Sequence, residues 1–380
     1  ESVKSRSVAD VPLGTFLSGG VDSSVVSLAL SKQLDSKIDT FSVGFEKKSF
    51  DESDKSRTVA NLIDSNHHEF IISVNDLKGN LDEILLNFDE PFADSSSLPT
   101  YLVANKTRQH VKVALTGDGG DEIFGGYNKY YIGKMNQKYS SVVPKSLHNK
   151  LKGAANKLLS TKDDKRGTRF KIRKLMNAIN YEGDFYYNII SLAFQQEDVS
   201  QLLKERWVKS EVFEPYKNTL NNKAENLTDF RNIDKILSLE GDMLVKVDRT
   251  SMLTSLESRA PFLNKKLWDF TGQLPEDYLM KGWDKKYILK EAFKEYFPKD
   301  FLNKSKKGFG VPVGDWLRGY LKPELESYVD DDFLEKQNLF EKEFVQNIVE
   351  NHITGKQDNT FRVWAFFCFQ KWYKETYANL

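Results

Sequence analysis

The chain has 380 residues, and its 55 basic and 55 acidic side chains give a formal net charge of zero. This balance argues against a nucleic-acid-binding face spread over the whole protein, although a local basic patch stays compatible with it. No apolar run approaches the roughly 18 residues that a membrane span requires, and no signal peptide is recognisable. With a single cysteine, an intrachain disulfide and a cysteine-based zinc site are both excluded. We therefore expect a globular, cytoplasmic enzyme of one large domain or two.

The first third of the chain alternates strand and helix patterns. Strands are predicted at 14–17, 39–44, 69–73 and 111–115, and helices at 23–33, 52–61, 77–87 and 100–107. Such alternation is typical of a doubly wound, mainly parallel α/β sheet with helices on both faces. In these sheets ligands bind beyond the carboxyl ends of the strands.

Residues 11–24, VPLGTFLSGGVDSS, combine an apolar strand, a turn of serine and glycine, and the start of a helix. Unpaired backbone N–H groups and the positive end of the helix dipole meet at such a turn, which makes it an anion site. Gly19 and Gly20 let the backbone approach a phosphate closely. Asp22 would repel a phosphate unless a divalent metal lay between them. The turn therefore predicts chemistry on a metal-bound nucleotide, and a plain tight turn with a helix cap is the structural alternative.

Residues 116–127, TGDGGDEIFGGY, follow the fourth predicted strand and place Asp118, Asp121 and Glu122 among five glycines. Repulsion among acids so close together indicates a metal, a cationic partner or a proton-transfer role. A solvated acidic turn is the alternative. Because this turn and the first one both follow strands of a parallel sheet, we expect them to meet at its carboxyl edge.

Beyond about residue 130 the strand pattern ends, and the remainder is predicted to be largely helical. Residues 242–263 have a helical pattern that Pro261 should terminate. Charged side chains in this segment, among them Lys246, Glu257 and Arg259, lie between apolar residues, so they are expected to be paired. A purely structural ion-pair network is one interpretation of them.

Two further segments carry polar side chains in a pattern that suits a binding site. Residues 304–316, KSKKGFGVPVGDW, combine three lysines with three glycines and predict a loop able to close over a polyphosphate; a solvated lysine run is the alternative. Residues 89–101, DEPFADSSSLPTY, either cap the helix that follows or contact substrate.

The motifs resemble a known family. SGGVDSS resembles the SGGxDS pyrophosphate loop of the ATP pyrophosphatase (PP-loop) enzymes, which cleave ATP between the α and β phosphates, whereas GxxxxGK[ST] and GxGxxG are absent. In chain order SGGVDSS, DEPFADSSSLPTY, TGDGGDEIFGGY, LVKVDRTSM with LESRAPFL, and KSKKGFGVPVGDW resemble the synthetase domain of glutamine-dependent asparagine synthetases. The resemblance covers essentially all 380 residues and is weakest over 134–230.

The resemblance implies a PP-loop, HUP-like α/β fold in one synthetase domain over residues 1–380. It divides the domain into an ATP-binding core at 1–130, a variable helical region at 131–235, and a helical region with active-site segments at 236–380. It also implies that ATP and Mg²⁺ bind at the sheet edge and that the aspartate side chain is adenylated. Ammonia then attacks β-aspartyl-AMP to give asparagine.

The resemblance assigns roles residue by residue. The positions that it implies for ATP and pyrophosphate are Leu17, Ser18, Gly19, Gly20, Asp22, Ser23, Ser24, Val43, Thr116 and Gly117. Asp22 and Asp121 would hold Mg²⁺. Lys306 would stabilise the transition state and the departing pyrophosphate. Asp118, where some relatives carry Glu, would handle the ammonia proton.

Full-length family members begin with a glutaminase domain whose first residue is a nucleophilic cysteine. Residue 1 here is Glu, and Cys368 lies near the other end, so we expect the N-terminal glutaminase domain to be absent. It was removed, which the missing initiator Met favours, or it lies on another polypeptide, or free ammonia is used. A tunnel from such a domain would enter near the strand edges. Aspartate and ammonia are then the substrates, no nucleic-acid or membrane partner is expected, and the oligomeric state stays open, a homodimer included.

Other functions fit the same motifs. A β-lactam synthetase-like enzyme, a lasso-peptide cyclase or a sugar-acid amidotransferase would also adenylate a carboxylate. More distant PP-loop enzymes, such as the tRNA-modifying group, usually show a basic balance or paired cysteines, which this chain lacks. A non-catalytic nucleotide-binding regulator would not need Asp121 or Lys306.

Overall fold

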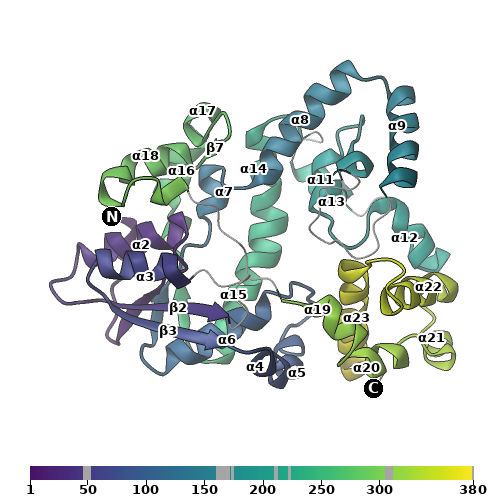
Figure 1. Cartoon of the computed structure of the whole chain (residues 1–380), viewed down its shortest axis with the longest axis horizontal. Coiled ribbons are helices and arrows are strands. Elements are labelled where there is room, and N and C mark those ends of the chain that lie inside the picture. Colours follow the sequence, from purple (N-terminus) through teal and green to yellow (C-terminus); the bar gives the residue numbers. More distant parts are fainter. Residues whose placement is uncertain are drawn as a thin grey trace. The chain divides into compact units, whose positions relative to one another are not determined.

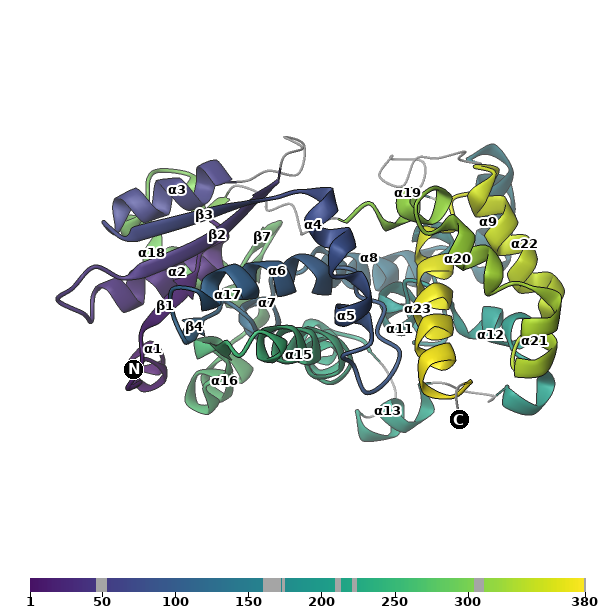
Figure 2. The same ribbon diagram turned by 90° about the horizontal axis from the view of Figure 1, so that it is seen from below.

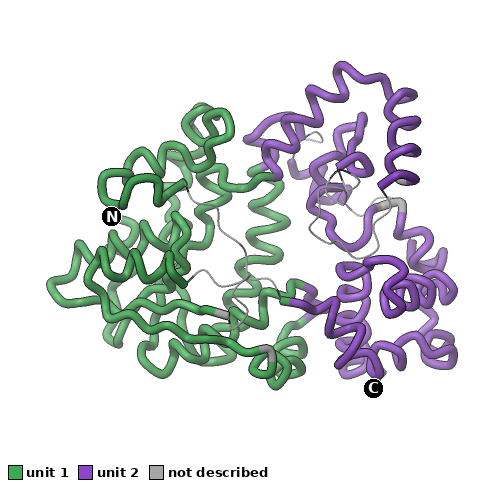
Figure 3. The backbone as a smooth tube through the Cα atoms, viewed as in Figure 1, with its two compact units in different colours: residues 1–89, 94–128, 231–311 green, residues 90–93, 129–230, 312–380 purple. Residues whose placement is uncertain are grey.

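The computed structural model describes residues 1–45, 53–159, 172, 175–208, 213–220, 224–303 and 311–378. The chain forms two compact units (Figure 3). Unit 1 comprises residues 1–89, 94–128 and 231–311, and unit 2 comprises residues 90–93, 129–230 and 312–380.

Unit 1 is built on a sheet of five parallel strands in the order β3-β2-β1-β4-β5. The strands are β1 (Leu13–Phe16), β2 (Asp39–Phe45), β3 (Asn66–Ile72), β4 (Val113–Leu115) and β5 (Glu257–Arg259). The direction in which strands are added reverses between β1 and β4. This is a topological switch point, beside which α/β sheets bind their ligands.

Helices cover both faces of this sheet. In Figures 1 and 2, α2 (Val21–Ser31) and α3 (Ser53–Leu62) lie on one face, and α6 (Ser97–Arg108) lies on the other with α15 (Val245–Leu253). Side chains of β1 alternate between the faces. The hydroxyl of Thr15 bonds that of Ser27 on α2 at 2.6 Å, whereas Phe16 packs on the opposite face. The apolar cluster of that face contains Phe41, Ala104, Val111, Ala114 and Leu256.

The other elements of unit 1 surround the sheet. They are α1 (Ser2–Arg6), α4 (Val74–Gly79), α5 (Leu81–Leu85), α7 (Gly120–Phe124), η3 (Pro261–Leu263), α16 (Lys265–Gly272), α17 (Glu276–Leu279), β6 (Met280–Lys281), β7 (Asp284–Lys285), α18 (Tyr287–Phe293), η4 (Lys294–Tyr296) and η5 (Phe301–Asn303). Strands β6 and β7 form an antiparallel hairpin. A π-helix of ten residues, η2 (Lys235–Leu244), runs directly into α15.

Unit 2 is helical apart from one isolated bridge between Leu203 and Phe340, as far as its described residues go. Its helices are α9 (Lys145–Leu158), α11 (Phe185–Ile190), α12 (Gln196–Leu202), η1 (Glu205–Trp207), α13 (Glu214–Thr219), α19 (Val313–Arg318), α20 (Lys322–Ser327), α21 (Asp331–Gln337), α22 (Lys342–Ile353) and α23 (Thr360–Thr376). Two more, α8 (Asn128–Val142) and α14 (Leu227–Asp234), have residues in both units. Figure 2 shows α23 beside α19 and α20.

The predicted fold class is confirmed, since the sheet is parallel and the rest of the described chain is mostly helical. Each of the four predicted strands overlaps an observed one. The prediction of one helix over 77–87 is wrong, because the chain is interrupted at Asn80 (φ −114°) and forms α4 and α5. The helical pattern of 242–263 also concealed a strand. Helix α15 ends at Leu253, Ser255 turns the chain at φ 59°, and β5 follows.

Among the helices of the described residues, none presents an apolar stretch of the length needed to cross a bilayer.

The sheet core predicts the effect of one substitution. Leu256 is fully buried against Phe41 and Ala104. Leu256→Ala is expected to lower the free energy of unfolding by about 2–5 kcal/mol, because it leaves a cavity in the core. Urea denaturation followed by circular dichroism measures it. Leu62→Ala, at a side chain 45% exposed, is the matched control and should change the stability far less. Equal losses in the two variants would contradict this assignment of the core.

Candidate active site

The turn between β1 and α2 is held tightly at the carboxyl edge of the sheet. The N–H of Leu17 donates to the carbonyl oxygen of Phe41 at 2.7 Å, which extends the pairing of β1 with β2. Gly19 then adopts φ 71°, and a Cβ there would lie 2.7 Å from the carbonyl carbon of Lys55. Only glycine fits this position without strain. The hydroxyls of Ser18 and Ser23 lie 3.0 Å apart at the start of α2.

The turn between β4 and α7 approaches the first one very closely. The N–H of Thr116 donates to the carbonyl of Arg259 on β5 at 2.8 Å, so β5 supports the start of this turn. A Cβ added to Gly117 would lie 2.9 Å from Cβ of Asp22 and 2.9 Å from the backbone nitrogen of Ser23. The lack of a side chain at Gly117 is therefore what lets the two turns meet.

Two carboxylates converge on one ammonium at this meeting point. Nζ of Lys286 lies 2.5 Å from Oδ2 of Asp22 and 2.7 Å from Oδ1 of Asp121. Lys286 is buried and sits in the left-handed region at φ 54°. Burial by itself lowers the pKa of this lysine, but the charges of Asp121 and Asp22 outweigh it and raise the pKa above its usual value. The ammonium therefore stays charged and neutralises part of the acid pair.

The acid pair also suits a hard divalent cation. Both carboxylates already face a single positive charge, and carboxylate oxygen is the ligand that Mg²⁺ prefers. No group of three or more His, Cys, Asp or Glu side chains that could hold a metal occurs among the residues described. Asp22 and Asp121 would therefore need phosphate oxygens and water to complete the shell, which is how Mg²⁺ commonly binds with nucleotides.

A buried acid lies next to this pair. Glu122, in the first turn of α7, is 1% exposed, and its Oε1 accepts a hydrogen bond from the hydroxyl of Tyr127 at 2.7 Å. Burial raises the pKa of the Glu122 carboxyl to about 7. The buried guanidinium of Arg231 donates to the backbone carbonyls of Glu122 and Ile123, both at 2.8 Å. It thus satisfies carbonyls at the carboxyl end of α7 and fixes that short helix.

A second buried cation comes from α15. Nζ of Lys246 lies 2.9 Å from Oδ2 of Asp94 and 2.9 Å from the hydroxyl of Ser96, and 3.2 Å from the sulfur of Met243. Asp94 also accepts from the N–H of Ser96 at 2.9 Å. Residues 94–96 thus precede α6 directly and are joined to α15 through Lys246.

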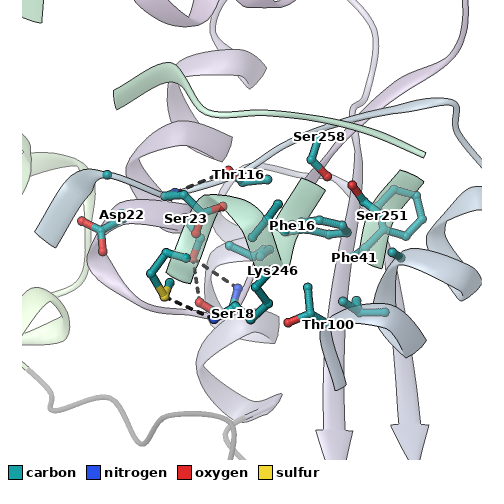
Figure 4. Close-up of a pocket in the computed structure, with 18 of the residues that line it drawn as sticks. Phe16, Ser18, Asp22, Ser23, Phe41, Thr100, Thr116, Lys246, Ser251 and Ser258 are labelled. Carbon is teal, nitrogen blue, oxygen red and sulfur yellow. Dashed lines mark hydrogen bonds between the residues drawn. The ribbon is translucent and has the colours of Figure 1, made fainter. Parts of the chain in front are cut away.

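Side chains of the two turns, together with Glu122, Tyr127 and Lys246, line a cavity of about 220 Å³ within unit 1. Figure 4 shows Asp22 and Ser23 toward one end of it, and Phe41 and Ser251 toward the other. The end beside the two turns is polar. Toward the other end, Phe41 packs with Phe16 and Ala104, and the hydroxyl-bearing Ser251 and Ser258 lie beside them.

The structure brings most of the predicted site residues to this cavity. Those that line it are Leu17, Ser18, Asp22, Ser23, Val43, Thr116, Gly117, Asp118 and Asp121. Gly19 and Gly20 shape the first turn without lining the cavity, and Ser24 is fully buried behind it. Lys306 lies outside the described residues. The ion pair considered for Glu257 and Arg259 is present at 2.7 Å.

Sequence reasoning missed Lys286. It lies 165 residues beyond Asp121, and its neighbours Asp284 and Lys285 carry no recognisable motif. Only the double lysine before the helix pattern of α18 marks the place, and such pairs are common on protein surfaces. Tyr127 was part of a motif but had been given no role.

Comparison with known sequences places this site in a family. A profile described as asparagine synthase matches residues 1–374. The chain is 31% identical over 98% of its length to asparagine synthetase [glutamine-hydrolyzing] 1 of Bacillus subtilis, and covers 57% of that protein. It is 31% identical over 98% of its length to a Mycobacterium tuberculosis protein provisionally named asparagine synthetase [glutamine-hydrolyzing], covering 56% of it. Amidase chyE of Penicillium rubens is 25% identical to this chain over 94% of the chain's length, and the match covers 58% of the amidase. The chain thus spans little more than half the length of these relatives.

The ammonium of Lys286 predicts a link between stability and divalent metal. Lys286→Met leaves two partly buried carboxylates facing each other, so the free energy of unfolding should fall by up to about 3–5 kcal/mol. Added Mg²⁺ should restore part of this loss, because it can take the place of the ammonium between Asp22 and Asp121. Urea denaturation with and without Mg²⁺ measures both effects.

The control for this substitution is Lys294→Met. Lys294 pairs with Glu291 on the surface at 2.8 Å. Its removal should change the stability little and should not introduce a dependence on Mg²⁺. A Lys286→Met protein as stable as the wild type, or indifferent to Mg²⁺, would contradict the proposed geometry of the acid pair.

Proposed function

Because the chain belongs to the asparagine synthase family, we propose that it converts aspartate to asparagine at the expense of ATP. The observation that carries the proposal is the convergence of Asp22 and Asp121 at the meeting point of the two turns. A phosphate-binding turn beside a carboxylate pair suits a metal-bound nucleotide, and the cavity beside it offers space for a second reactant.

The proposed reaction has two steps. In the first, an oxygen of the aspartate side-chain carboxylate attacks the α-phosphorus of ATP, and the bond to the β-phosphate breaks with release of pyrophosphate. In the second, ammonia attacks the β-carbonyl carbon of β-aspartyl-AMP. AMP leaves with the electron pair of the broken C–O bond, and the nitrogen loses a proton to become the amide.

The residues of this chain would bind and orient the reactants. The turn 18–23 would hold the pyrophosphate portion through backbone N–H groups and the hydroxyls of Ser18 and Ser23. Val43, at the cavity wall, would contact the adenosine portion. Asp118 would accept the proton of the attacking nitrogen. Asp22 and Asp121 would hold Mg²⁺, which neutralises phosphate charge as pyrophosphate forms. Lys286 lies close enough to these carboxylates to contribute its charge to the same phosphates.

Ammonia would reach the site along the apolar end of the cavity. Phe16, Phe41 and Ala104 pack together in the cavity wall, and apolar walls favour neutral ammonia over the ammonium ion. Two relatives are named for glutamine hydrolysis, and this chain covers 57% and 56% of their lengths. We propose that a glutaminase domain, in the same polypeptide or another, supplies the ammonia, or that free ammonia is used. A cytoplasmic location belongs to the same proposal.

The second candidate function keeps the chemistry and changes the reactants. The chain is also similar to a protein named as an amidase, and this similarity makes another acid and another amine the alternative reactants. A β-lactam synthetase-like, lasso-peptide cyclase-like or sugar-acid amidotransferase reaction would use the same adenylation. A nucleotide-binding regulator without catalysis is the remaining alternative.

Turnover tests the proposed function directly. With aspartate, ATP, Mg²⁺ and ammonium chloride, the protein should form asparagine and AMP in equal amounts. It should also exchange labelled pyrophosphate into ATP when aspartate is present. Asp22→Asn should reduce both rates at least about a hundredfold, because it removes a charge that the bound metal requires. Exchange with another acid but not with aspartate would favour the second candidate, and no exchange with any acid would favour the regulator.

Lys306 gives an independent prediction. Lys306→Ala should slow both pyrophosphate exchange and asparagine formation by about a hundredfold or more, since it removes the positive charge that the family resemblance assigns to stabilising the departing pyrophosphate. The KM for ATP should change much less than kcat. Lys299→Ala, seven residues before Lys306 in the sequence, is the control and should leave the activity unchanged. Full activity of Lys306→Ala would remove this residue from the mechanism.

A further inference from the structure

The cavity wall contains one buried acid that has no cationic partner among the described residues. Five charged side chains line the cavity: Asp22, Asp118, Asp121, Glu122 and Lys246. The first and third share Lys286, and Lys246 pairs with Asp94. Neither Asp118 nor Glu122 forms an ion pair with a cation among the residues that the structure describes. These two acids therefore differ from the other charged side chains of the wall, each of which has a partner of opposite charge.

Exposure separates these two acids from each other. Asp118 is partly exposed, so water can solvate its charge. Glu122 is 1% exposed, and its one side-chain partner is the hydroxyl of Tyr127 at 2.7 Å. A neutral hydroxyl offers a hydrogen bond without compensating the charge. A buried carboxylate in this state is costly unless a cation reaches it.

The contacts around Glu122 leave its carboxyl available to a ligand. The nearest buried guanidinium, that of Arg231, donates to the backbone carbonyls of Glu122 and Ile123 and of Thr271. It fixes the position of α7 but does not pair with the Glu122 carboxylate. Tyr127 also lines the cavity and fixes the orientation of that carboxylate through Oε1. The pair is thus preorganised toward the cavity.

We infer that Glu122, oriented by Tyr127, binds the α-ammonium group of the amino-acid substrate. This rests on the proposed function, in which aspartate enters this cavity. Among the proposed reactants only aspartate brings a positively charged nitrogen, because ammonia attacks as the neutral molecule. Glu122 directly follows Asp121 in α7. An ammonium bound to Glu122 would therefore lie close to the acid that is proposed to face the nucleotide phosphates. Recognition of the α-ammonium would select α-amino acids over other dicarboxylates.

Binding of two ligands that differ only at this group tests the inference. Succinate keeps both carboxylates of aspartate and lacks the ammonium. In the presence of Mg²⁺ and α,β-methylene-ATP, titration calorimetry should show that the wild-type protein binds aspartate about tenfold to a hundredfold more tightly than succinate. Glu122→Gln should lose most of this discrimination by weakening aspartate alone. Tyr127→Phe, which retains the carboxylate, should keep discrimination but reduce it a few-fold.

The chain offers a matched control. The hydroxyl of Tyr101 donates to Oε2 of Glu83 at 3.2 Å, which is the same pair of groups away from the cavity. Glu83→Gln and Tyr101→Phe should leave the discrimination unchanged. Urea denaturation of every variant shows whether it is folded before binding is compared.

The outcomes separate this inference from the proposed function. Because binding needs no turnover, an inactive wild-type protein that still prefers aspartate through Glu122 would overturn the proposed function and support the inference. A wild-type protein that binds succinate as tightly as aspartate would overturn the inference even if asparagine is made. Retained discrimination in folded Glu122→Gln would do the same. If that variant does not fold, the wild-type comparison and Tyr127→Phe decide, and loss of all discrimination in folded Tyr127→Phe would also contradict the assigned roles.

Discussion

The neutralisation of two converging carboxylates is the constraint on which the site depends. Asp22 and Asp121 lie at the starts of α2 and α7, directly after the two turns, and their approach brings like charges together in a partly buried place. Coulomb repulsion would separate the turns unless a cation lay between them. In the protein without ligands, that cation is the ammonium of Lys286. The absence of a side chain at Gly117 removes the steric barrier to the same approach. Lys286 therefore removes the electrostatic barrier, and Gly117 the steric barrier, to the meeting of the two turns at the switch point of the sheet.

The sheet explains why one cavity can serve both halves of the proposed chemistry. Its carboxyl edge exposes backbone N–H groups and acids, which suit phosphate and metal. Its face beneath α6 and α15 supplies Phe16 and Phe41, and α6 itself supplies Val103; these apolar side chains suit a small neutral nucleophile. An activated acyl group formed between these two surroundings would meet ammonia before it met bulk water. Exclusion of water is what such an intermediate needs, since hydrolysis would waste the ATP.

Much of this arrangement could be predicted from the sequence, for identifiable reasons. Strands β1 to β4 each contain apolar residues and are bounded by turns, and the meeting of the turns after β1 and β4 follows from parallel topology alone. Lys286 could not be predicted, because its role depends on a fold that returns a distant residue to the acid pair. Strand β5 has three residues and lies between a helix and a proline, so it has too few positions for an alternating pattern. The special character of Glu122 also needed coordinates, because composition does not show which acids acquire a cation.

The π-helix η2 has a consequence for how relatives of this chain can diverge. It leads into α15, and so it sets the direction in which Met243 and Lys246 face the cavity. Deleting one residue from such a segment would turn everything after it by about 100° around the helix axis relative to what precedes it. Two homologues with the same side chains here but different segment lengths would thus present different walls to their substrates. An insertion or deletion of one residue in η2 would therefore change the wall of this cavity without any change of side chain.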